Sequence, residues 1–106
     1  MSTPISDAEV VDLPAEDRFV VKGPDDVAEL DYALQGDRLL LVHTEVPQSW
    51  SGQGIGSRLI RAALRRARTE GLTIVPWCPY ARKWLKDHRD EAAGVPIDFK
   101  TPPPPS

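Results

Sequence analysis

The chain has 106 residues, with 16 acidic and 13 basic side chains and a formal net charge of −3. This length suits one small domain, and the acidic total argues against a general nucleic-acid-binding protein. The single cysteine excludes an internal disulfide, and no segment is long and apolar enough to span a membrane. Because the acidic start does not resemble a signal peptide, we expect a cytoplasmic protein with no membrane partner.

The charges are unevenly distributed along the chain. Residues 1–50 contain 11 acidic and 3 basic side chains, whereas residues 51–90 contain 3 acidic and 9 basic ones. A solvated basic helix face accounts for most of the arginines. The same asymmetry also suits an anionic ligand on the second half of the chain and a cationic one on the first.

The two ends differ in composition from the middle. Residues 1–17 hold five acidic side chains and no basic one, and residues 93–106 include a run of four prolines. Such a run cannot form the interior of a helix or of a strand ladder. We therefore expect a mobile acidic segment over 1–17, a folded core over 18–92 and a proline-rich tail over 93–106.

Three strands are predicted in the first half of the core. Residues 18–22 have a short apolar centre, and residues 27–34 alternate between apolar and acidic side chains, as half-buried strands do. The turn sequence at residues 35–37 predicts a hairpin into a third strand over 38–46. Apolar side chains at four successive positions, 39–42, predict that this third strand is covered on both faces.

The second half of the core predicts a helix, a strand and a second helix. Apolar residues recur at helical spacing over 56–70, and Gly71 is the expected end of that helix. The apolar segment 72–78 follows a helix, so it should run parallel to the third strand. Pro76 has no N–H group and leaves this strand unpaired on one side near its end. A last helix over 80–88 completes a mixed α/β (α+β) fold in the order β-β-β-α-β-α.

Three glycines alternate along residues 52–56, between the third strand and the first helix. A bare backbone turn before a helix N-terminus offers free N–H groups and a positive dipole to an anion. Two common phosphate loops do not fit. Ser57 and Arg58 stand where a Walker loop has Lys-Ser/Thr, and Leu59 stands where a dinucleotide-binding loop has glycine or alanine. A structural turn without a ligand is the alternative.

These elements resemble the GNAT superfamily of acyl-CoA-dependent N-acetyltransferases. Its signature, Arg/Gln-x-x-Gly-x-Gly/Ala at a strand-to-helix turn, aligns with residues 51–56. The segments 40–46 and 77–80 further resemble a small stand-alone "N-acetyltransferase domain-containing" subfamily. The resemblance covers about residues 18–90. It implies a minimal GNAT-like fold, with antiparallel N-terminal strands and a splayed pair of parallel strands that flank a CoA site.

The resemblance implies acetyl-CoA as the co-substrate. The CoA pyrophosphate is expected on the backbone N–H groups of the glycine turn, and the pantetheine arm along the third strand, in the gap beside the next one. The residues implied in binding are Thr44, Val46, Gln53, Gly54, Ile55, Gly56, Ser57 and Arg58.

Two features of the sequence depart from the superfamily's pattern. Ser51 replaces the Arg or Gln of the signature, and the pair of helices that larger members insert after the first strand is missing. The acceptor side is therefore open, or is completed by a second copy of the chain or a protein partner.

Acetyl transfer to an amine needs a proton acceptor, stabilisation of an oxyanion and an acid for the departing thiolate. Glu45 is the carboxylate nearest the expected thioester, and His43 shares its strand face; a paired carboxylate and a core histidine are the alternatives. Cys78 precedes a helix N-terminus, which favours the thiolate, so it is either a covalent acetyl carrier or a packing residue. Tyr80 resembles the general-acid phenol of relatives, or is a surface residue at a helix start.

The leading hypothesis is an N-acetyltransferase that moves an acetyl group from acetyl-CoA to a primary amine. The amine would belong to a small polyamine, a peptide or a protein lysine, and transfer would be direct or through Cys78. The alternative is a catalytically silent CoA-binding sensor or interaction module. No aromatic platform accompanies the helix arginines for nucleic acid, and two histidines with one cysteine form no metal site.

Overall fold

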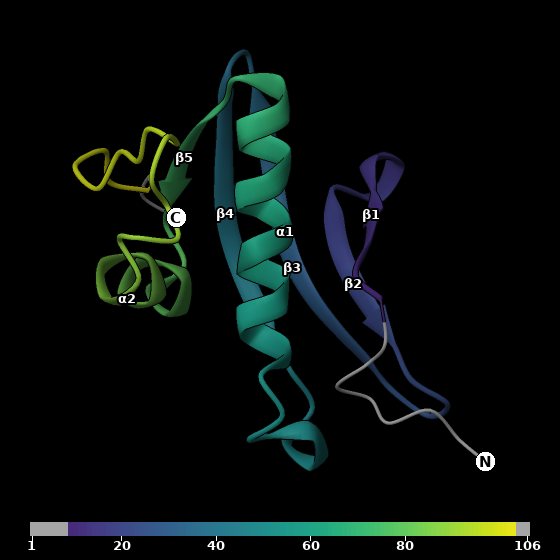
Figure 1. Cartoon of the computed structure of the whole chain (residues 1–106). Coiled ribbons are helices and arrows are strands. Elements are labelled where there is room, and N and C mark those ends of the chain that lie inside the picture. The colour runs from purple at the N-terminus through teal and green to yellow at the C-terminus, as the bar shows by residue number, and fades with distance from the viewer. Residues whose placement is uncertain (1–8, 104–106) are drawn as a thin grey trace.

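The computed structural model describes residues 9–103. Within them, a five-stranded sheet in the order β1-β2-β3-β4-β5 is accompanied by two α-helices (Figure 1). The strands are β1 (Val11–Leu13), β2 (Arg18–Lys22), β3 (Val27–Gln35), β4 (Arg38–Glu45) and β5 (Thr73–Pro76). The helices are α1 (Ile55–Glu70) and α2 (Pro79–Asp87), and short 3-10 turns lie at Pro14–Glu16 and Gln48–Trp50. The mixed α/β fold expected from the sequence is confirmed.

The direction of each strand follows from its connection. The first four strands pair in antiparallel fashion, and β5 joins β4 in parallel. Parallel neighbours need a crossover, and α1 provides it by running along the sheet in front of β3 and β4 (Figure 1). The predicted parallel pair is therefore present, and α1 begins next to the end of β4.

One face of the sheet carries the hydrophobic core. Ala28, Leu30 and Tyr32 of β3 are buried against the helices, whereas Glu29 and Asp31 between them face the other side. The buried residues of α1 and α2 belong to the same cluster. Each fully buried leucine or isoleucine contributes roughly 1.5–3 kcal/mol to stability, so this cluster dominates the energetics of the fold.

The prediction that β4 is covered on both faces is wrong in part. Both helices pack on the face of Leu39 and Leu41. On the opposite face Leu40 is buried, but Val42 is 46% exposed. Val42 is the extra residue of a β-bulge, at which the register of β4 against β3 shifts by one position. The bulge was not predicted, because it depends on strand pairing and leaves no mark in the local pattern.

The N-terminal end of the described chain is ordered by β1, which the sequence analysis placed in a mobile segment. The hydroxyl of Tyr32 donates to one carboxylate oxygen of Asp12 (2.6 Å), and Arg66 of α1 donates to the other (3.0 Å). Arg66 also donates to the Tyr32 hydroxyl (2.7 Å). This network joins β1, β3 and α1, which lie far apart in the sequence.

The C-terminal segment, which was expected to be a proline-rich tail outside the core, makes specific contacts with the sheet over the residues described. Ile97 forms a parallel bridge with Ile74 on the free edge of β5, and Asp98 pairs with Arg38. The indole N–H of Trp77 donates to the carbonyl of Thr101 (3.0 Å). Figure 1 shows this segment alongside β5. Composition alone missed these contacts because every partner lies in another part of the chain.

Ionisation of Tyr32 tests the network at β1. Burial, followed by the hydrogen bond to Asp12, raises the pKa of Tyr32 to about 12. The chain has two tyrosines, so tyrosinate absorbance after a rapid pH jump should show one ionisation delayed to about pH 12. This step should be missing in Tyr32→Phe and should move to lower pH in Asp12→Asn.

The same raised pKa has a consequence for stability. Only the native state disfavours the ionised phenol, so the free energy of unfolding should fall as the pH rises above the ordinary tyrosine pKa of 10.0. Tyr32→Phe should remove this dependence. An unchanged late ionisation step in Tyr32→Phe would contradict the assignment.

Candidate functional site

The backbone between β4 and α1 forms an uncapped helix N-terminus. Gly52 and Gly54 have φ angles of 81° and 72°, in the left-handed region that favours glycine. In the described chain no side chain caps the helix. The first helical hydrogen bond runs from the N–H of Arg58 to the carbonyl of Gly54 (3.1 Å), so the N–H groups of residues 55–57 lack helical acceptors. These groups are available to an anion.

A groove of about 310 Å³, here called the turn groove, lies over this helix N-terminus. Its walls are the end of β4, the 3-10 turn at Gln48–Trp50, the glycine turn and the first turn of α2. The lining residues are Thr44, Val46, Pro47, Gln48, Trp50, Ser51, Gly52, Gly54, Ile55, Gly56 and Tyr80. The groove thus joins an anion-binding backbone to a mostly apolar channel beside β4.

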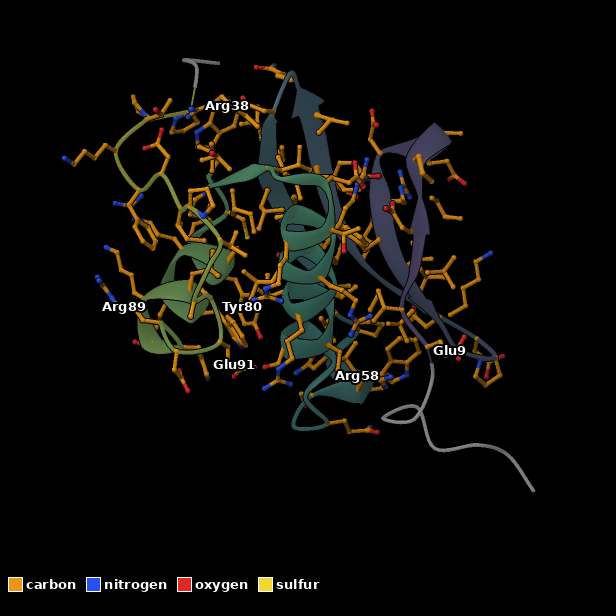
Figure 2. The ribbon with its side chains drawn as sticks, turned by 45° about the horizontal axis from the view of Figure 1, so that its top comes forward. Glu9, Arg38, Arg58, Tyr80, Arg89 and Glu91 are labelled. Carbon is orange, nitrogen blue, oxygen red and sulfur yellow. The ribbon has the colours of Figure 1, made fainter. Side chains whose placement is uncertain are left out.

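Tyr80 closes the α2 side of the turn groove. Its side chain is partly exposed and lies between α2 and α1 (Figure 2). A Cβ atom at residue 56 would lie 2.8 Å from Cζ of Tyr80, which is closer than van der Waals contact permits. Glycine at position 56 is therefore what allows the phenol to rest on the helix N-terminus.

The parallel strands separate at the inner end of the turn groove. β4 and β5 pair as far as Leu41 and Pro76. The carbonyl of Leu41 then accepts hydrogen bonds from the N–H groups of both Trp77 (3.0 Å) and Cys78 (2.9 Å), as the chain turns towards α2. The predicted loss of pairing near Pro76 is confirmed, and within residues 9–103 the rest of β4 has no strand partner on this edge.

Cys78 lies across this gap from β4. It is the N-cap residue of α2 and is only 4% exposed. Its Sγ atom is 3.2 Å from Oγ1 of Thr44, which lines the turn groove. Cys78 is thus buried, as a packing residue would be, yet it touches the wall of the groove. The contact with Thr44 was missed from the sequence, because it depends on how the two strands separate.

His43 and Glu45 lie on the opposite face of β4 from Thr44. They pair with Asp31 and Glu29 of β3, whose side chains face away from the helices. Their side chains are 58% and 67% exposed, with Nε2 of His43 3.7 Å from Oε2 of Glu45. The shared face predicted for these two residues is confirmed, and the alternative of a core histidine is wrong.

Glu45 lines a second hollow, here called the carboxylate hollow, of about 450 Å³. Asp26 and Glu29 are its other acidic residues, and residues 46–48 separate it from the turn groove, since they line both. Sequence reasoning missed Asp26 and Glu29, because only the pairing of β3 with β4 places Glu29 beside Glu45 and brings the turn before β3, which contains Asp26, to the same hollow. A ligand in this hollow would approach β4 from the side opposite the turn groove.

Carboxylates on this face crowd one another. A hydrogen bond with the Asp31 carboxyl, followed by burial and by the charge of Asp31, raises the pKa of Glu29 above its ordinary value. Arg18 lies 3.3 Å from Glu29 and offsets the repulsion in part. A positively charged ligand would offset the repulsion that Arg18 leaves among these carboxylates. This face of the sheet therefore suits such a ligand.

Three predicted cofactor residues do not bring their side chains into the turn groove. Gln53, Ser57 and Arg58 are absent from its lining. The Ser57 hydroxyl instead accepts a hydrogen bond from the indole of Trp84 (2.8 Å). Arg58 lines another cavity, of about 510 Å³, on the side of Glu9 (Figure 2).

The sequence profile of GCN5-related N-acetyl-transferases matches residues 18–95. The chain belongs to this GNAT family. It is 38% identical over 74 residues to protein NATD1 of Gallus gallus and of Homo sapiens, which covers 67% of this chain and 67% and 66% of theirs. The resemblance inferred from the signature is therefore confirmed.

A GNAT fold is also seen in a solved structure similar to this one. The NMR structure of a GCN5-like putative N-acetyltransferase from Staphylococcus aureus superposes with a TM-score of 0.68 at 23% identity, covering 90% of this chain and 95% of that one. At this identity the likeness shows the fold. GNAT membership implies acetyl transfer with acetyl-CoA as the co-substrate.

The residues present fit CoA in this place. Unpaired N–H groups at residues 55–57 suit the pyrophosphate, and the narrow apolar channel beside Val46 and Pro47 suits the pantetheine arm. Within residues 9–103, no cluster of three or more His, Cys, Asp or Glu could hold a metal ion. No helix in that range is long and apolar enough to cross a membrane.

Gly56→Ala tests the close approach of Tyr80. The alanine Cβ would clash with the end of the Tyr80 side chain, which can rotate away. We therefore expect the Tyr80 ring to leave the turn while the position of α1 is unchanged. Alanine's higher helix propensity offsets the lost contacts, so the free energy of unfolding should change by less than about 1 kcal/mol. Nuclear Overhauser contacts between the Tyr80 ring and the backbone of residues 55–57 should disappear.

Gly52→Ala is the matched control. Space around residue 52 is open, and only its left-handed backbone opposes alanine. The Tyr80 contacts should persist in this variant. If Gly56→Ala keeps them too, the assigned packing of Tyr80 is wrong.

Proposed function

We propose that the protein is an acetyl-CoA-dependent N-acetyltransferase whose acceptor is a primary amine. The observation that carries this proposal is the path of the turn groove. It begins at the free N–H groups of residues 55–57 and ends at Thr44, which contacts Cys78 where β4 and β5 separate. The carboxylate hollow lies on the other side of the same segment of β4.

In this arrangement the chain binds CoA mainly through its backbone. The N–H groups of residues 55–57 and the helix dipole hold the pyrophosphate. Val46 and Pro47 guide the pantetheine arm towards Thr44. Ser51, in place of the Arg or Gln of the signature, removes one phosphate or turn contact, so the glycine turn supplies more of the binding.

The acceptor amine enters from the carboxylate hollow. Asp26, Glu29 and Glu45 attract the ammonium form of the amine. Glu45 then accepts a proton from it, directly or through water, because only the neutral amine is a nucleophile. His43, 3.7 Å from Glu45, can take the proton onward. A small polyamine, a peptide N-terminus and a protein lysine all meet these requirements.

Two routes lead from acetyl-CoA, which supplies an activated acetyl group when bound, to the amine. In the direct route the amine nitrogen bonds to the acetyl carbon, the thioester bond breaks, and Tyr80 gives a proton to the departing thiolate. The amide nitrogen releases its extra proton to water, and Tyr80 recovers a proton from water. In the second route the Cys78 thiolate first takes the acetyl group as a new thioester and CoA leaves. The amine then displaces Cys78, which leaves as its thiolate, and the amide nitrogen releases its extra proton to water.

Mass spectrometry of the intact protein after incubation with acetyl-CoA separates the two routes, alongside a thermal-shift titration with CoA. Ligand at a hundredfold its dissociation constant should stabilise the fold by about 2.7 kcal/mol. Under the covalent route one acetyl group appears on Cys78, and Cys78→Ala loses both adduct and transfer. Full turnover by Cys78→Ala would leave the direct route. Absence of any CoA-induced shift would overturn the proposed function.

A silent CoA-binding sensor is the second candidate, and Ser51 favours it because the signature residue is missing. It predicts a thermal shift with CoA but no transfer to any amine in a panel. Slow transfer or hydrolysis that depends on Glu45 or Cys78 would exclude it.

Glu45→Gln tests the proton-acceptor role. An amide keeps the shape but cannot take the proton, so kcat/KM for the amine should fall by about 10²- to 10⁴-fold while CoA affinity is unchanged. If Glu45 only attracts the ammonium group, KM rises and kcat stays the same. Glu16→Gln, an exposed acid far from β4 in sequence, is the control and should behave as wild type.

A further inference from the structure

A third hollow, here called the arginine hollow, takes no part in the proposed reaction. It has a volume of about 510 Å³ and lies beside α1, on the side of Glu9 (Figure 2). Three arginines, one acidic residue and two apolar residues line it, namely Arg58, Arg61, Arg65, Glu9, Val10 and Ala62. None of these residues lines the turn groove or the carboxylate hollow, so the arginine hollow is a surface of its own.

Positive charge dominates the arginine hollow. Arg58, Arg61 and Arg65 are spaced by three and four residues, so they follow one flank of α1 and face a single carboxylate, that of Glu9. Arg68 continues this stripe and donates to two backbone carbonyls (3.2 and 3.3 Å), which are uncharged acceptors. The flank of α1 therefore attracts a negatively charged ligand.

Two of the arginines differ in how they are held. The guanidinium of Arg61 donates to both carboxylate oxygens of Glu91 (2.7 and 3.2 Å) and lies 5.5 Å from the ring centroid of Trp84. Arg65 is exposed and makes no hydrogen bond or ion pair within residues 9–103. Arg61 is thus a fixed wall of the hollow, and the guanidinium of Arg65 can turn towards a ligand.

The base of the arginine hollow is apolar. Val10 and Ala62 are partly buried and pack against the hydrophobic core. Among the described residues that line the hollow there is no aromatic side chain, whereas single-stranded nucleic acid is bound by stacking its bases on aromatic rings. An apolar base between guanidinium groups instead suits a polypeptide segment that combines carboxylates with an apolar side chain.

We propose that the arginine hollow docks an acidic segment of a partner protein. Carboxylates of the segment pair with the guanidinium groups, which accept them in a bidentate geometry, and an apolar side chain of the segment packs on Val10 and Ala62. Because an α-helix rises 1.5 Å per residue, Arg65 lies about 12 Å along α1 from residue 57. Docking there leaves the turn groove and the carboxylate hollow open, and it requires no acetyl transfer by the protein.

The test measures fluorescence anisotropy of two labelled peptides with the full chain at low ionic strength. In one peptide glutamates flank a leucine, and in the other a serine replaces the leucine, so both carry the same charge. The wild-type protein should bind the leucine peptide about tenfold more tightly, because only leucine buries apolar surface in the hollow. Arg65→Glu should weaken binding of the leucine peptide about tenfold, since it replaces an attraction by a repulsion. Arg65→Gln, which only removes the charge, should show a smaller loss.

Arg89→Glu is the matched control, because it changes the net charge equally at an exposed arginine that points away from α1 (Figure 2). It should bind the leucine peptide as wild type does. Equal weakening in Arg65→Glu and Arg89→Glu would overturn the proposal, and so would equal affinity of wild type for the two peptides. Displacement of the peptide by a single-stranded DNA of the same charge, or by saturating CoA, would also overturn it, because the hollow would then belong to nucleic acid or to the co-substrate.

Discussion

The site depends on the place where β4 and β5 stop pairing. Pro76 has no N–H group to continue the ladder, and the Leu41 carbonyl is shared by the next two N–H groups of the chain. The strands therefore diverge while both are still held in the core by their earlier pairs. The gap places Cys78 opposite Thr44 and lets the turn groove reach the interior of the sheet without breaking the fold.

The two sides of β4 differ in character, since one lines the mostly apolar turn groove and the other lines the carboxylate hollow. Successive residues at this end of β4 point to opposite faces, so Thr44 faces the turn groove while Glu45 faces the carboxylate hollow, with His43 on the same face of the sheet as Glu45. In the proposed reaction, the thioester and the amine would reach this segment of β4 from opposite directions.

Two side chains of α2 pack against the first turn of α1, directly after the glycine turn. Tyr80 rests on Gly56, and Trp84 holds the Ser57 hydroxyl, so α2 is locked onto the first turn of α1. The backbone N–H groups stay open because no side chain of the described residues caps α1. A rigid turn of this kind is organised before a ligand arrives, which lowers the entropy that binding must overcome.

The sequence by itself determined the strands and helices of the core to within a few residues, the parallel pair and the glycine turn. These features follow from local periodicity, from the missing N–H group of Pro76 and from the spacing of the glycines. It also placed His43 and Glu45 on one face of a strand, since alternation is a property of the backbone.

Only the tertiary structure decided which side chains meet. The bulge at Val42, the contact of Thr44 with Cys78 and the place of Arg58 outside the turn groove depend on register and packing. The same holds for the two ends of the chain, where Asp12 and Asp98 find partners on α1, β3 and β4. The physical reason is that such contacts join residues distant in the chain, and local patterns carry no information about distant partners.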